Sequence, residues 1–344
     1  MKIYTFLDFN TSCIAGTMGG ISNLNYYIPT AEVTTYHYDA LKNRTFDGDS
    51  GNDVLFIFEI GNPQHSNWTT KQLREKFPNA KFVALCSDTI YYQLNGLPFQ
   101  MDPDGIDLHL EVMPQSVEWL NSKGIRAEFF RWGISDDLIN KALAFASNTF
   151  FKDFADKLHD GHSKNLSYKK DIDFIGVYHP GTISNPQCWR HHAVKHIENN
   201  GYIFTQGGGN GHQDDNIERL LSHYTRSKFT LGTSSHNRPE LTRLGCMKFF
   251  RDELGPLLNS LLIYDKHPNV ELRYNYGKEV VPLYDYDNFE SILDLHKKLW
   301  NSVEYDRLLF KQKIFVMRHS FERELLRCLV KHNIIDKELV CETL

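Results

Sequence analysis

The residues with the clearest chemical potential lie in the stretch 228–251, KFTLGTSSHNRPELTRLGCMKFFR. Its pattern predicts a strand over 229–231, a turn of small residues over 232–235, a helix that opens near Pro239 and a second strand over 247–250. Proline suits a first helical position, because the amide hydrogen that it lacks would have no partner there.

Polar side chains gather around this predicted helix start. The free amides of a helix start attract anions, and a carboxylate beside them can accept hydrogen bonds from the hydroxyls of a sugar diol. The stretch therefore predicts a nucleotide site, whose candidate residues are Ser234, Ser235, His236, Arg238 and Glu240.

Two glycine-rich segments follow predicted strands. Gly207 and Gly208 come after a strand over 202–205, where they either let the backbone approach a ligand closely or form a mobile loop. Gly19 and Gly20 end the loop that follows the first strand, over 2–9. Their sequence, GTMGG, is not the dinucleotide fingerprint, so we expect a flexible loop that faces a cleft.

A predicted helix over 187–199 is rich in cationic and titratable side chains, namely Arg190, His191, His192, Lys195 and His196. Such a helix after a strand and a loop favours phosphate binding, and the alternative is a solvated helix face. His192 and His196 have the spacing of a metal pair on a helix, but the sequence around them does not match a known metal-binding motif. We therefore expect no metal site.

A candidate for acid–base chemistry is Asp88, which follows the predicted strand over 81–86 in the run ALCSDTI. A carboxylate just beyond the carboxyl end of a parallel strand is well placed to accept a proton from a substrate hydroxyl. The alternative is that Asp88 caps the helix that follows.

The elements that must position these residues alternate between strand and helix, which predicts an α/β fold of two Rossmann-like domains. The apolar run over 53–60 is typical of a parallel strand covered on both faces, and Gly124 closes a predicted helix over 114–123. A length of 344 residues exceeds the usual size of a single core. The predicted divisions are a first domain over 1–150, a polar linker over 151–170, a second domain over 171–318 and a C-terminal helix over 319–344 that packs back towards the first domain.

The composition limits the location and the partners. A net charge of −5 disfavours nucleic acid as the main partner, although a local basic groove would escape this measure. The six cysteines include no CxxC pair, which favours a reducing compartment. Because we find neither a signal peptide nor a run of ~20 apolar residues, we expect a soluble, cytoplasmic protein without a membrane span.

Several sequence runs occur in the order in which similar runs occur in the two-domain GT-B glycosyltransferases. The chain most resembles those related to spore-maturation glycosyltransferases. The similar runs are DLHLEVMPQSVEWLNSKGIRAEFFRWGIS, DIDFIGVYHPG, KFTLGTSSHNRPELTRLGC, GKEVVPLYDYDNFESILDLHKKLWNSVEYDRLLFKQKI and RHSFEREL, which lie between Asp107 and Leu326. The resemblance implies two Rossmann-like domains that face each other across a cleft, with C-terminal helices that close the structure. It also implies transfer of a hexosyl or pentosyl group from a nucleotide-diphosphate sugar, with a UDP-sugar expected and no obligatory cofactor.

The same resemblance assigns roles. The C-terminal domain would bind the donor and the N-terminal domain the acceptor; Glu240 would hold the ribose hydroxyls, and Arg190 and Arg238 would meet the diphosphate. The loop before Arg190, HPGTISNPQCWR, is longer than the family's short loop, which makes that position a departure from the pattern. Asp88 is similar in position to the general base of the phage β-glucosyltransferase that modifies hydroxymethylated DNA.

The acceptor stays open. The acidic net charge favours a glycan or another small acceptor, and a hydroxymethylated base in DNA is the alternative. A nucleotide-sugar epimerase, or a binding protein of the same fold without transfer activity, are the alternatives to a glycosyltransferase.

Overall fold

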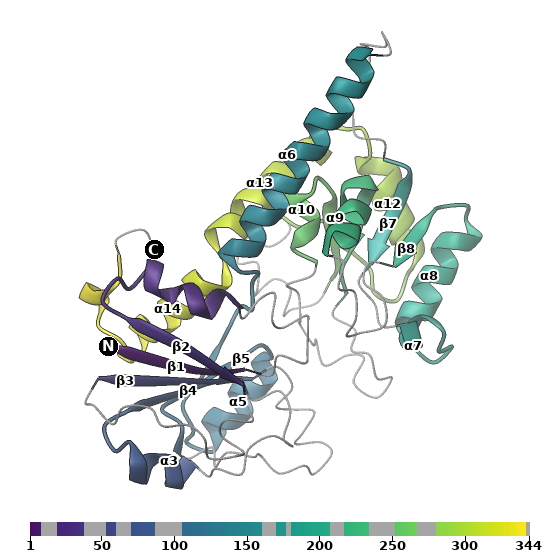
Figure 1. Cartoon of the computed structure of the whole chain (residues 1–344). Coiled ribbons are helices and arrows are strands. Elements are labelled where there is room, and N and C mark those ends of the chain that lie inside the picture. The colour runs from purple at the N-terminus through teal and green to yellow at the C-terminus, as the bar shows by residue number, and fades with distance from the viewer. Residues whose placement is uncertain are drawn as a thin grey trace. The chain divides into compact units, whose positions relative to one another are not determined.

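The computed structural model describes residues 1–7, 19–37, 53–59, 70–86, 105–159, 170–176, 180–206, 217–233, 252–266 and 280–341. The chain forms two compact units: unit 1 comprises Met1–Ser135 and Phe321–Leu344, and unit 2 comprises Asp136–Ser320. Each unit contains a sheet whose strand pairs are all parallel in the part of the chain described, with helices packed on it (Figure 1). The predicted α/β class with two Rossmann-like sheets is therefore confirmed.

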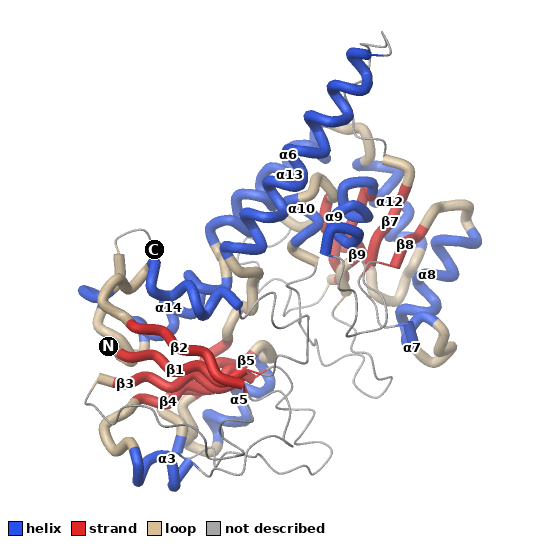
Figure 2. Tube along the Cα trace, in the orientation of Figure 1, coloured by secondary structure: helices blue, strands red, loops and turns tan. Residues whose placement is uncertain are grey.

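The sheet of unit 1 has the strand order β2-β1-β3-β4-β5-β6 (Figure 2). Its elements are β1 (Lys2–Leu7), the 3₁₀ helix η1 (Gly19–Tyr26), β2 (Glu32–His37), β3 (Val54–Glu59), α3 (Thr70–Lys76), β4 (Lys81–Cys86), β5 (Leu108–Glu111), α5 (Pro114–Ser122), β6 (Ala127–Phe129), α14 (Phe321–Lys331) and the 3₁₀ helix η5 (Lys337–Leu339).

Phenylalanine rings fill the core of unit 1. Phe6, Phe56, Phe58 and Phe82 have no exposed surface, and the ring centroids of Phe6 and Phe58 lie 5.4 Å apart in a stacked arrangement. Side chains on both faces of β3 are buried, as the continuous apolar run predicted.

Helix α14 belongs to unit 1 although it lies near the end of the sequence. The Phe321 ring packs edge-on against the Phe130 ring at 5.5 Å, and its amide donates to the carbonyl of Ile134 at 2.9 Å. At the other end of the helix, the Lys331 ammonium lies 2.7 Å from a carboxylate oxygen of Glu128. These contacts attach the C-terminal helix to β6 and to the residues that follow it.

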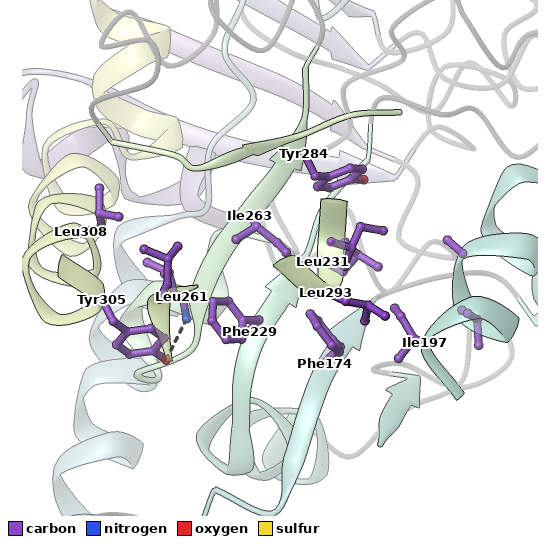
Figure 3. Packing of buried hydrophobic residues seen from close by; sticks show 14 of the residues in the cluster. Phe174, Ile197, Phe229, Leu231, Leu261, Ile263, Tyr284, Leu293, Tyr305 and Leu308 are labelled. Atoms are coloured by element: carbon purple, nitrogen blue, oxygen red, sulfur yellow. Dashed lines mark hydrogen bonds between the residues drawn. The ribbon is translucent and has the colours of Figure 1, made fainter. Parts of the chain in front are cut away.

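The sheet of unit 2 has the strand order β11-β10-β9-β7-β8. Its elements are α6 (Asp136–His159), β7 (Ile172–Gly176), α7 (Pro180–Ile183), α8 (Trp189–Asn199), β8 (Phe204–Gln206), α9 (Ile217–Arg226), β9 (Ser227–Leu231), α10 (Leu254–Leu257), β10 (Leu261–Asp265), β11 (Leu283–Tyr284), α12 (Glu290–Leu299) and α13 (Val303–Arg318). Figure 3 shows the core between this sheet and its helices, where Phe174, Phe229 and Ile263 from three neighbouring strands meet Leu293 and Leu308.

Several elements differ from the predictions. β2 was not predicted, because its sequence EVTTYH is polar; in the structure, Thr35 of β2 accepts a hydrogen bond from the Thr5 hydroxyl at 2.9 Å. Gly19 and Gly20 form the first turn of η1 and do not lie in a loop. The last strand of unit 2, β11, comprises only two residues, Leu283–Tyr284.

Helix α6 runs without a break through residue 150, where we predicted that the first domain ends, and the two compact units divide between Ser135 and Asp136. No helix in the described part of the chain is long and apolar enough to cross a membrane.

Candidate functional site

The topology of unit 2 singles out one edge of its sheet. β7 is flanked by β8 on one side and by β9 on the other. The connection from β7 to β8 therefore runs one way across the sheet, and the connection from β8 to β9 runs back past β7. In doubly wound sheets of this strand order, ligands bind outside the carboxyl ends of the strands at this switch point. We call the region beyond Gly176 of β7 and Leu231 of β9 the switch edge.

Two buried tyrosines hold the backbone where β9 ends at the switch edge. The Tyr264 hydroxyl donates to the carbonyl of Thr233 at 2.8 Å, and the Tyr284 hydroxyl donates to the carbonyl of Gly232 at 2.7 Å. Both tyrosines are only 1% exposed. We call this pair the tyrosine clamp. It fixes the direction in which the chain leaves the sheet.

The clamp requires a glycine at position 232. A Cβ atom added there would lie 2.1 Å from Cε2 and 2.3 Å from Cδ2 of the Tyr264 ring. Because that ring is buried, it has no free space into which it could move. The absence of a side chain at Gly232 therefore lets Tyr264 pass beneath the backbone and reach the Thr233 carbonyl.

The candidate residues of the opening stretch follow this clamp directly. Thr233 is the last described residue before Ser234, Ser235, His236, Arg238 and Glu240, all of which lie outside the described residues. The same holds for Gly207 and Gly208, which follow the end of β8 at Gln206. Their roles stay predictions, but the structure fixes the point from which the segment 234–240 departs.

The start of α8 is tied to the clamp through an aromatic stack. The Trp189 ring lies 5.9 Å from the Tyr284 ring with an interplanar angle of 17°, and 5.1 Å from the Tyr286 ring. The Trp189 indole also donates to the Tyr286 carbonyl at 2.8 Å. Arg190, the next residue, lies in the first turn of α8 and is half-buried. A helix start with an arginine and the clamped backbone of β9 thus share one tyrosine, Tyr284.

Three further titratable residues of α8 have partners inside unit 2. The Lys195 ammonium lies 2.9 Å from the Glu198 carboxylate, and the His196 imidazole lies 3.2 Å from the Glu290 carboxylate. The His191 ring contacts the carbonyl of Ile183 at 2.6 Å. These contacts favour a solvated helix face for the later turns of α8. Arg190 stays a candidate for phosphate binding because it lies in the first turn of α8, beside the residue that stacks on Tyr284.

Within the described residues, no group of three or more His, Cys, Asp or Glu side chains is arranged to hold a metal ion. A helix start and arginine side chains are able to meet a diphosphate by charge and hydrogen bonding.

In unit 1, Asp88 lies outside the described residues, two positions beyond the end of β4 at Cys86. The neighbouring strand β5 carries a buried pair that the sequence analysis did not identify. His109 and Glu111 are fully buried, and Nδ1 of His109 lies 4.0 Å from Oε1 of Glu111. The register pairs Glu111 with Cys86, so this carboxylate lies beside the strand end that leads to Asp88.

The sequence contains a signal for this pair. The run LHLE of β5 alternates leucine with an ionisable residue, and residues two apart in a strand share one face of the sheet. Buried ionisable residues near the carboxyl end of a parallel strand are good candidates for a functional role.

Solved structures of known proteins supply the comparison. No family model matches the chain, and no curated protein sequence matches it. The structure of a glycosyltransferase from Rickettsia africae matches with a TM-score of 0.54 and 14% identity, covering 98% of each chain. A trehalose-6-phosphate synthase matches with a TM-score of 0.57 and 10% identity, covering 97% of this chain and 99% of that one.

An α-glucosyltransferase solved with UDP and a 13-mer DNA containing a HMU base matches with a TM-score of 0.52 and 12% identity, covering 97% of this chain and 100% of that one. The chain has the GT-B fold. At such low identity the matches establish the fold alone, and the GT-B prediction made from the ordered sequence runs is confirmed.

Proposed function

We propose that the protein is a glycosyltransferase that moves a hexosyl or pentosyl group from a nucleotide-diphosphate sugar to an acceptor hydroxyl. The observation that carries this proposal is the joint position of the tyrosine clamp and the first turn of α8 at the switch edge of unit 2. The three solved structures with a similar fold, named above, are of enzymes that transfer glycosyl groups or make a sugar phosphate, and one of them was solved with UDP. This supports a UDP-sugar as the donor.

In the proposed donor site, Glu240 accepts hydrogen bonds from the ribose hydroxyls, and Arg190 and Arg238 pair with the diphosphate. The guanidinium group suits this role because it offers a planar fork of donors to phosphate oxygens. Ser234, Ser235 and His236, with the backbone at Gly207 and Gly208, complete the donor site. Unit 2 is thus the proposed donor-binding unit, and unit 1 the acceptor-binding unit.

Asp88 is the proposed base if the reaction inverts the configuration at the anomeric carbon; a retaining enzyme would not need it. Asp88 takes the proton of the acceptor hydroxyl while that oxygen bonds to the anomeric carbon, and the bond between this carbon and the diphosphate oxygen breaks. The two arginines and the helix amides neutralise the charge that develops on the leaving diphosphate, without an obligatory metal. The residues around Gly19 and Gly20 form the proposed acceptor-side segment.

We propose a glycan or another small molecule as the acceptor, and a modified base in DNA as the second candidate. The acidic net charge favours the first, and the similar fold of an α-glucosyltransferase solved with DNA favours the second.

The test separates the donor roles from the base. The purified full chain is incubated with UDP- and GDP-sugars and a panel of glycans and hydroxymethylated oligonucleotides, and the release of nucleotide diphosphate and the glycosylated product are measured. We expect Glu240→Ala to weaken UDP binding at least about tenfold, because charge-assisted hydrogen bonds contribute roughly 1.5–3 kcal/mol each. Asp88→Asn should lower turnover roughly a hundredfold or more while UDP binding survives.

Two results would contradict the proposal. If no nucleotide diphosphate binds the wild-type chain or raises its melting temperature, unit 2 is not a donor domain. If Asp88→Asn transfers sugar at the wild-type rate, the base lies elsewhere, and His109 with Glu111 is the next pair to test.

A further inference from the structure

Helix α13 exposes apolar side chains to solvent along its whole length. One face of the helix packs into unit 2 through Tyr305, Leu308, Gln312, Phe315 and Val316. On the opposite face, the exposed fractions are 87% for Val303, 64% for Phe310 and 37% for Met317. A single exposed apolar residue needs no explanation, but aligned apolar residues on one helix form a patch whose exposure to water is unfavourable in free energy.

The spacing of the three residues shows what kind of surface fits them. They are seven positions apart, which is almost two helical turns, so they form a stripe nearly parallel to the helix axis and about 21 Å long. A stripe with this period packs against another helix at a crossing angle of about 20°. The shape therefore fits a helix with a similar stripe.

The charges along α13 make the helix complementary to itself in one direction. The first turn is acidic, with Glu304 and Asp306, whereas Lys311 and Arg318 make the second half basic. A second copy in parallel orientation would place like charges beside each other. An antiparallel copy places the acidic turn of each helix beside the basic end of the other, and opposite charges flanking an apolar seam set the orientation of paired helices.

We propose that the exposed face of α13 is a homodimer contact, in which two copies of this chain pair antiparallel about a two-fold axis near Phe310. In this arrangement Val303 faces Met317 of the partner subunit, and the two Phe310 rings meet at the centre. The contact is isologous, because the same stripe serves both copies. The proposal does not depend on the proposed enzymatic activity.

The dimer is expected to be weak. One helix face from each copy gives an interface below about 1,200 Å² in total, the size range of transient complexes. Sedimentation velocity of the full chain over about a hundredfold range of concentration should therefore show a monomer that converts to a dimer.

Phe310→Asp should weaken dimerisation at least about tenfold, because it places a carboxylate at the centre of the stripe on both copies. The matched control is Tyr26→Asp, which places the same charge at an aromatic residue that is 73% exposed in η1 of unit 1. The control should dimerise like the wild type. Thermal unfolding at low concentration verifies that both variants are folded.

Charge exchange tests the orientation. Arg318→Glu alone should weaken the dimer, and adding Glu304→Lys should restore it, since each exchanged residue again meets an opposite charge. Glu304 also pairs with Arg307 of its own helix at 2.5 Å, so the double variant is compared with Glu304→Lys alone.

A wild-type chain that stays monomeric over the whole range, or a Phe310→Asp variant that dimerises normally, would overturn the proposal. A dimer that is weakened by Phe310→Asp but indifferent to Arg318→Glu would overturn the antiparallel arrangement.

Discussion

Replacing Tyr264 by phenylalanine removes one hydroxyl from the tyrosine clamp and keeps the buried ring. The carbonyl of Thr233 then loses a hydrogen bond of 2.8 Å. Tyr264 is only 1% exposed, so water has little access to replace the lost hydroxyl. Removing one partner of a buried hydrogen bond costs about 1–3 kcal/mol of unfolding free energy. The backbone that leads into the segment 234–240 also loses one of its two anchors, so we expect weaker nucleotide binding.

A second buried tyrosine, Tyr305 of α13, supplies a control at the other end of β9. The Tyr305 hydroxyl donates to the carbonyl of Lys228 at 2.5 Å, near the amino end of β9. The Tyr305 hydroxyl also accepts from the Leu261 amide at 3.4 Å. Tyr305 is also buried, so Tyr305→Phe likewise removes a hydroxyl that donates to a backbone carbonyl, here at the opposite end of the strand. Both variants should therefore lose a similar amount of unfolding free energy in urea titrations.

Their effects on binding should differ. If the loss of the Tyr264 hydroxyl weakens UDP binding by about 1.4 kcal/mol, the affinity of Tyr264→Phe for UDP falls about tenfold. The affinity of Tyr305→Phe should stay at the wild-type value. Isothermal titration calorimetry with UDP, at a temperature where both variants are folded, measures this difference. Equal losses of affinity, or no loss in either variant, would refute the role that we give to the clamp.

Three further predictions concern Gly232, the acceptor, and the amino edge of the sheet in unit 2, by which we mean the region at the amino ends of its parallel strands. Gly232→Ala should destabilise unit 2 and weaken UDP binding more than Tyr264→Phe does, since the new Cβ would lie 2.1 Å from the Tyr264 ring, and thermal melting with and without UDP measures both effects. Unfolding free energy should fall as the pH drops below about 6.5. The reason is that burial lowers the pKa of His296 in the folded state despite attraction by Asp173, so the unfolded state binds the proton more readily. Urea titrations of His296→Gln should show a flatter dependence of unfolding free energy on pH. If the acceptor is DNA, transfer should fall steeply with added salt, whereas a flat salt profile would indicate a glycan or small acceptor.

Protonation of His296 and protonation of Asp173 both lower the unfolding free energy as the pH falls. When the pKa of a histidine is lower in the folded state than in the unfolded state, the protein loses stability as the pH falls through the ordinary pKa of histidine. For Asp173, burial acts to raise the pKa, but the hydrogen bonds from the Ile203 amide and from Lys228 outweigh it and lower the pKa. Its contribution is present above the ordinary pKa of an aspartate, about 3.9, and is lost as the pH falls below that value.

Much of the fold was predictable from local sequence. The strand β3 is apolar over its first five residues, β7 is apolar apart from Asp173, and Gly124, with a φ of 78°, closes its helix as predicted. The strand β2 was not predictable in the same way, because polar residues such as Thr34 and Thr35 hide the alternation on which a strand prediction depends.

The clamp could not be predicted from local patterns. Its two hydrogen bonds join residues that are 31 and 52 positions apart, and a tyrosine in an apolar strand gives no sign of which carbonyl its hydroxyl will reach. By contrast, the three apolar residues of α13 that are spaced seven positions apart are visible in the sequence, but only the burial of the opposite face shows that they point to solvent.

The two edges of the sheet in unit 2 offer competing candidates for a functional site, and their topology decides between them. The amino edge contains the more perturbed groups: burial, with a smaller effect of nearby Lys313, lowers the pKa of Lys170 to about 7. Asp173 lies there as well, 2.5 Å from the Lys228 ammonium. Perturbed groups of this kind are often catalytic.

Here, however, their hydrogen bonds are to the fold itself. The Lys170 ammonium donates to the carbonyls of Ser227 and Asn259, both at 2.7 Å, and thereby joins the starts of two strands. Ligands of doubly wound sheets bind outside the carboxyl ends of the strands, and the amino edge lies at the opposite ends. The perturbed groups at the amino edge therefore serve stability. At the switch edge the tyrosine clamp contacts backbone carbonyls at Gly232 and Thr233, which is the point from which the proposed donor segment departs.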